Sequence, residues 1–120
     1  MTQVEHFEDM PVWQEARILN REIHGLLKGC HDYGFIDQIS RASVSVMNNI
    51  AEGFERSNTK EFRHFLRIAK GSVGEVRSML YLASDFEYIP NDQCMLQTQR
   101  CVEISRMLAG FMRYLHARVL

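Results

Sequence analysis

Residues 59–86 read TKEFRHFLRIAKGSVGEVRSMLYLASDF, a long amphipathic stretch without a proline. Its apolar residues recur at alternating spacings of three and four, as expected for a helix that turns one face toward a core. Every position of this main stripe is apolar: Phe62, Leu66, Ala69, Val73, Val76, Leu80 and Ala83. The pattern predicts one long helix over residues 59–86.

Three further segments show the same periodicity and predict helices over residues 11–28, 35–54 and 92–118. Pro11 and Pro90 lie where helices would begin, a location that suits proline because its missing N–H needs no partner there. No segment alternates with the period of a strand for long enough to be convincing. Short loops between amphipathic helices predict an all-α fold, an up-down-up-down four-helix bundle that forms a single domain over residues 1–120.

Composition narrows the class of protein but not its activity. The chain has 120 residues, of which 46% are apolar, and its 14 Lys+Arg against 15 Asp+Glu give a net charge of -1. These values exclude intrinsic disorder and a uniformly basic protein. Three irregularly spaced cysteines argue against a disulfide framework, and the acidic first residues have no apolar run like that of a signal peptide. We therefore expect a cytoplasmic location.

A second apolar stripe lies beside the first on the helix predicted over residues 59–86. At 100° per residue, the two stripes together cover roughly 200° of arc, whereas one core needs little more than ~100°. The additional apolar surface has two possible explanations. Either this helix is the most buried one of a lone bundle, or the surface contacts another subunit, and we favour the second interpretation. The candidate interface residues are Phe65, Ile68, Ser72, Met79, Leu82 and Phe86.

The remaining arc of the same helix is basic. Residues 41–80 carry 7 basic and 4 acidic side chains, whereas residues 1–40 carry 3 and 7. A row of basic side chains along one helix face is either an ordinary solvated face or a surface that contacts the phosphates of a nucleic acid. No aromatic residue interleaves with the row, so we expect no platform for base stacking. The candidate nucleic-acid-binding residues are Arg56, Lys60, Arg63, Arg67, Lys70 and Arg77.

Metal and catalytic motifs are weak. Glu61 and His64 have the E-x-x-H spacing of di-iron bundles, but that chemistry requires a second such motif, which the sequence lacks. Cys94 and Cys101 lie on an apolar helix face, where packing is the simpler role. The chain has no glycine-rich phosphate loop and no nucleophile motif. We therefore expect no catalytic residue, no bound metal and no cofactor.

Polar residues also occur within the predicted helix over residues 35–54. Asn49 and Glu52 lie among apolar neighbours, and a partly buried carboxylate needs a partner or several hydrogen-bond donors. Arg41 and Glu75 are candidate partners. The sequence therefore predicts a structural polar network of Arg41, Asn49, Glu52 and Glu75 that fixes how the helices align.

Several motifs in combination resemble one family. They are VWQEAR at residues 12–17, SRASVS at residues 40–45 continuing to NIAEG at residues 49–53, KEF at residues 60–62 with the following FL, IA and GS pairs, and FEYI at residues 86–89. Together they resemble the four-helix-bundle proteins encoded by intervening sequences in bacterial 23S ribosomal RNA genes. The resemblance spans about residues 7–115.

The resemblance implies a compact bundle assembled into a ring-shaped homopentamer without known catalytic activity. Related proteins include the accessory variability protein of diversity-generating retroelements, whose basic surfaces are implicated in binding nucleic acid and a reverse transcriptase. The functional hypothesis is a non-enzymatic homo-oligomer that presents its basic surface to RNA or to an RNA-bound protein. The alternative is a protein–protein adaptor ring that binds no nucleic acid.

Overall fold

The computed structural model describes residues 4–119. Four α-helices follow a short 3-10 turn, η1 (Phe7–Asp9): α1 (Pro11–Leu26), α2 (Tyr33–Phe54), α3 (Thr59–Asp85) and α4 (Asn91–Val119). The four predicted segments are confirmed, with every boundary within two residues of its predicted position. No strand occurs in residues 4–119, so the predicted all-α class is also confirmed.

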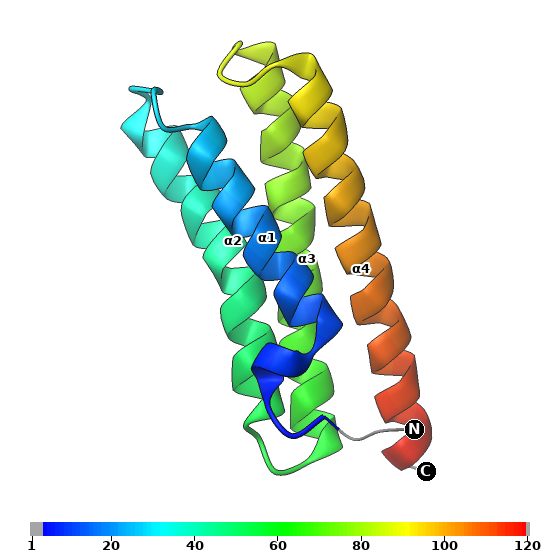
Figure 1. The fold of residues 1–120 in the computed structure, drawn as a ribbon. Coiled ribbons are helices and arrows are strands. Elements are labelled where there is room, and N and C mark those ends of the chain that lie inside the picture. Colours follow the sequence, from blue (N-terminus) through cyan, green and yellow to red (C-terminus); the bar gives the residue numbers. More distant parts are fainter. Residues whose placement is uncertain (1–3, 120) are drawn as a thin grey trace.

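The helices form an elongated antiparallel bundle of 48 × 21 × 20 Å (Figure 1). Helix α3 packs along both α2 and α4, whereas α1 contacts α2 and α4 and lies diagonally across from α3. Because α3 and α4 are antiparallel, the first turns of α3 and the last turns of α4 lie at the same end of the bundle (Figure 1). This arrangement brings together residues that are about fifty positions apart in the sequence.

The main stripe of α3 lies in the core, as its periodicity predicts. From Leu66 to Ala83 its members are at most 1% exposed, and Phe62 packs its ring against Phe54 and Phe111. Cys94 and Cys101 are buried in the same core. Burial raises the pKa of the Cys101 thiol to about 12, so this side chain is a neutral packing group at physiological pH.

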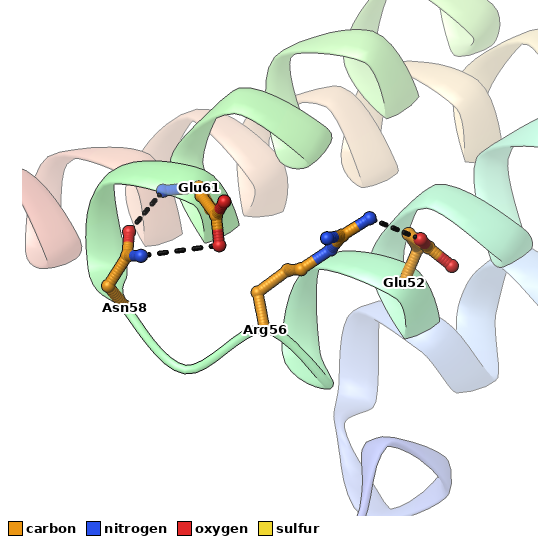
Figure 2. A network of polar contacts seen from close by, with 4 residues as sticks. All are labelled: Glu52, Arg56, Asn58 and Glu61. Atoms are coloured by element: carbon orange, nitrogen blue, oxygen red, sulfur yellow. Dashed lines mark hydrogen bonds and ion pairs between the residues drawn. The ribbon is translucent and has the colours of Figure 1, made fainter.

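Asn58 caps the start of α3 (Figure 2). Its side-chain oxygen accepts a hydrogen bond of 2.8 Å from the Glu61 backbone N–H, and its amide nitrogen donates to the Glu61 carboxylate at 3.2 Å. The three-residue spacing of Asn58 and Glu61 is that of a capping box. A cap of this kind stabilises a helix by about 1 kcal/mol and defines where the chain turns into α3.

Helices α2 and α3 approach each other closely at Gly53. A Cβ added there would lie 2.9 Å from Phe65 Cβ, 2.8 Å from Phe62 Cδ1 and 3.2 Å from the Phe62 carbonyl oxygen. At Gly71, by contrast, an added Cβ would meet nothing within 4 Å. Only at Gly53 of these two positions does the packing of α2 on α3 leave no room for a side chain.

Gly53→Ala is expected to lower the free energy of unfolding by about 1–3 kcal/mol, because the methyl group overpacks a rigid contact. Gly71→Ala is the control, and it should raise stability by about 0.5–1 kcal/mol through its better helix propensity. Chemical denaturation followed by circular dichroism measures both. Equal effects of the two substitutions would contradict the close approach at Gly53.

The opposite end of the bundle is held by a hydrogen bond between Tyr88 and Asp32. Helix α3 ends with backbone hydrogen bonds from Tyr88 N–H to the Ala83 carbonyl and from Glu87 N–H to that of Ser84, with Glu87 at φ 61°. This turn directs the Tyr88 hydroxyl to Asp32 Oδ2 at 2.6 Å. The other oxygen of Asp32 caps α2 by accepting from Phe35 N–H.

This hydrogen bond makes stability depend on pH. The hydrogen bonds from Tyr88 and Phe35 lower the pKa of Asp32, and the carboxylate raises the pKa of Tyr88 to about 12. Since the pKa of Asp32 is lower in the folded state, its stabilisation is present above the unfolded value of about 3.9. It is lost as the pH falls through the folded value.

We therefore expect Tyr88→Phe to destabilise the protein near neutral pH and to do so progressively less below about pH 4. The measurement is the free energy of unfolding of both proteins across this pH range. Tyr33→Phe, at a 71% exposed tyrosine of α2, is the matched control and should show no such trend. A destabilisation by Tyr88→Phe that stays constant from neutral to acid pH would refute the role of Asp32.

Candidate nucleic-acid interface

The basic residues predicted from the sequence lie on the α2–α3 turn and on the face of α3 that points away from the core. Lys60, Arg67 and Arg77 are exposed, whereas Arg63 and Lys70 are partly buried. We call these five residues of α3 the basic row. Among residues 4–119, no carboxylate of an Asp or Glu lies within ion-pair distance of any member of the row. None of these positive charges therefore forms an ion pair with a described acidic side chain.

Arg56 differs from the basic row. Its guanidinium donates to Glu52 at 2.7 Å, so the side chain turns back along α2 (Figure 2). The same group lies 4.9 Å from the centre of the Phe65 ring. Because Glu52 already pairs with it, Arg56 presents less unpaired positive charge than the members of the row.

The first turns of α3 and the preceding turn enclose a hollow of about 920 Å³, which we call the α3 hollow. Its lining combines the predicted cations with an aromatic pair. The imidazole of His64 is exposed and meets the edge of Phe65, with ring centres 5.5 Å apart and planes inclined by 73°. The lining residues are Arg56, Asn58, Lys60, Glu61, Arg63, His64, Phe65 and Arg67.

No aromatic side chain interleaves with the basic row itself, but His64 and Phe65 lie beside it and line the same hollow. They follow Arg63 directly on α3, and Arg56 of the α2–α3 turn lies over the Phe65 ring. The sequence signal was the adjacent pair His64-Phe65 directly after Arg63.

A second hollow of about 530 Å³ runs between α3 and α4, and we call it the α3–α4 groove. Helix α4 contributes two cationic or ionisable groups, Arg113 and His116, that we did not predict. Their three-residue spacing was visible in the sequence, but their location beside α3 requires the fold. The lining residues are Arg63, Arg67, Ala109, Met112, Arg113, His116 and Ala117.

The predicted cations therefore fall into two groups, those that line a hollow and those that do not. Arg56, Lys60, Arg63 and Arg67 meet in the α3 hollow, and Arg63 and Arg67 also line the α3–α4 groove. Lys70 and Arg77 line neither hollow and lie farther along α3. Arg77 is near Cys101, where its positive charge acts against the rise in the pKa of the thiol.

Only some of the candidate interface residues of α3 are exposed enough to contact another subunit. Ile68, Leu82 and Phe86 are 40%, 42% and 53% exposed, and Phe65 is partly buried. Met79 is 6% exposed and belongs to the core, which corrects its assignment to the outer surface. Ser72 is partly buried and its hydroxyl lies 2.9 Å from that of Ser45 on α2.

The predicted polar network of Arg41, Asn49, Glu52 and Glu75 is not formed. Arg41 pairs with Asp37 one turn away on α2, and Glu52 pairs with Arg56 of the α2–α3 turn, and both pairs are exposed to solvent. Glu75 is exposed on α3. Within α2, Asn49 Nδ2 donates instead to Ser45 Oγ at 2.9 Å. The hydroxyl of Ser45 then connects α2 to α3 through a hydrogen bond of 2.9 Å with that of Ser72.

Nowhere in residues 4–119 do three or more His, Cys, Asp or Glu side chains gather closely enough to hold a metal ion. Within the same range, none of the helices has both the length and the apolar character needed to cross a membrane.

Comparison with known proteins identifies the family. The family described as 23S rRNA-intervening sequence protein matches residues 8–110. A crystal structure of a protein of unknown function from the S23 ribosomal protein family of Bacteroides thetaiotaomicron superposes with a TM-score of 0.79 at 24% identity. The superposition covers 84% of this chain and 97% of that one, and it shows a shared fold. No curated protein matches the sequence significantly. This chain belongs to the 23S rRNA-intervening sequence protein family.

Proposed function

We propose that this protein is a cytoplasmic, non-catalytic homo-oligomer that presents the basic row of α3 to RNA. The observation that carries the proposal is the row itself, five cations without a described carboxylate within ion-pair distance. Keeping like charges side by side is unfavourable unless solvent or an anionic partner offsets their repulsion.

Nucleic-acid phosphates suit this surface. Each Lys or Arg that contacts a phosphate releases condensed counterions, which favours binding at low salt. Arg63 and Arg67 are one helical turn apart and line both hollows, so they occupy the centre of the charged region. Symmetric subunits would repeat the row and multiply its field even though each chain carries a net charge of -1.

Arg63→Glu/Arg67→Glu should reduce RNA affinity by at least tenfold at about 50 mM salt and should flatten the dependence of affinity on salt. Fluorescence anisotropy with a labelled RNA at about 50 and 200 mM salt measures both effects. The matched control is Arg17→Glu/Arg21→Glu, which makes the same charge change at the same spacing on exposed positions of α1, diagonally across the bundle.

Equal loss of binding in the two double variants would mean that only net charge matters, and it would contradict the assignment to α3. Wild-type binding by Arg63→Glu/Arg67→Glu would contradict it as well. A purified protein that carries no nucleic acid, binds no RNA and co-purifies with another protein would instead support the adaptor alternative.

The proposed oligomer rests on the exposed apolar side chains of α3. Ile68, Leu82 and Phe86 leave apolar surface in water along one helix, an arrangement more typical of an interface than of a free surface. The resemblance to ring-forming relatives makes a homopentamer the proposed assembly.

Leu82→Glu/Phe86→Glu is expected to shift the assembly toward monomers, because it places charge in an apolar contact. Sedimentation velocity measures the change, with Tyr81→Glu, at a 51% exposed residue on another side of α3, as the control. A wild-type mass near the monomer value of 14.0 kDa would refute the oligomer.

A further inference from the structure

The α3 hollow and the α3–α4 groove are neighbouring depressions that share two lining residues, Arg63 and Arg67. We call them the two arms of the candidate site: one lies at the first turns of α3 and the α2–α3 turn, and the other lies between α3 and α4. Both lie toward the end of the bundle where α3 starts and α4 ends (Figure 1). A ligand that occupies both arms must therefore follow a path over Arg63 and Arg67 from one side of α3 to another.

The arm between α3 and α4 has the chemistry of a phosphate-binding groove. Arg63 and Arg67 approach from α3, and Arg113 and His116 approach from α4. No Asp or Glu lines this groove, and none in residues 4–119 pairs with these arginines within 4.0 Å. The rest of the lining is apolar, with Met112 between two alanines, so the groove offers charge on its walls and a surface for sugar or base contact.

The other arm offers a stacking platform. His64 is exposed and its ring is supported edge-on by Phe65, which Arg56 covers at 4.9 Å from its centre. A flat side chain held in this way loses little further freedom when a base stacks on it. Stacking on such side chains is the usual means by which proteins hold unpaired bases next to a charged groove.

We infer that the RNA bound here is a single strand, with its phosphates in the α3–α4 groove and an unpaired base against His64. This inference rests on the proposed function and specifies its ligand. Duplex DNA has a persistence length of about 50 nm, and a base-paired RNA helix is likewise too stiff to bend within the width of one α-helix and occupy both arms, whereas a single strand can. Arg113, His116 and His64 thereby join the interface.

The test compares three ligands with equal numbers of phosphates: single-stranded oligouridine, an abasic strand and a blunt RNA duplex. Wild-type protein should bind oligouridine more tightly than the duplex. His64→Ala should weaken oligouridine binding about tenfold and leave binding of the abasic strand unchanged, because the abasic strand has no base to stack. Arg113→Glu should weaken binding of both strands to a similar extent, because it removes a phosphate contact.

The controls are His24→Ala and Arg21→Glu, which make the same changes at exposed positions of α1. All four substituted residues are exposed, so each variant should keep its fold and assembly, and circular dichroism and sedimentation check this. Both control variants should bind all three ligands as the wild type does.

The outcomes separate this inference from the proposed function. If Arg63→Glu/Arg67→Glu loses binding while His64→Ala and Arg113→Glu bind normally, or if duplex binds as tightly as single strand, the path is wrong but RNA binding stands. If no RNA binds the wild type at low salt, both proposals fail. Displacement of the strand by polyglutamate of equal charge at the same concentration would show a general anion surface and would also overturn the inference.

Discussion

The main apolar stripe of α3 is buried against two neighbouring helices, and the rest of the structure depends on this burial. Helix α3 packs along α2 and along α4, and Gly53 lets α2 come close enough for Phe62 and Phe65 to fill the contact. A buried stripe of this kind determines the rotation of α3 about its own axis. Everything on the other side of the helix must then face water or a partner.

That rotation explains why the charges of this end of the bundle converge. With Leu66 and Ala69 in the core, Arg63 and Arg67 are turned toward the outer edge of the α3–α4 contact. The antiparallel course of α4 then brings Arg113 and His116 to the same groove (Figure 1). A basic site is thus assembled from two helices although the whole chain carries a net charge of only -1.

Periodicity alone predicted the four helices, their approximate boundaries and the core stripe, because these depend on residues within a few turns of each other. The predicted polar network failed because Glu52 pairs locally with Arg56, four residues on, rather than across to α3. That Met79 would be covered depends on how the neighbouring helices pack. The sequence also could not place His64 and Arg113 at one site, since only packing brings α2, α3 and α4 together there.

RNA is proposed to bind where α3 starts and α4 ends. Arginine-specific chemical modification read by mass spectrometry, with and without single-stranded RNA, tests this directly. RNA should protect Arg63, Arg67 and Arg113, while Arg17 and Arg21 on α1 should react equally in both samples. Equal reactivity of all five arginines with and without bound RNA, or protection of the α1 pair alone, would contradict it.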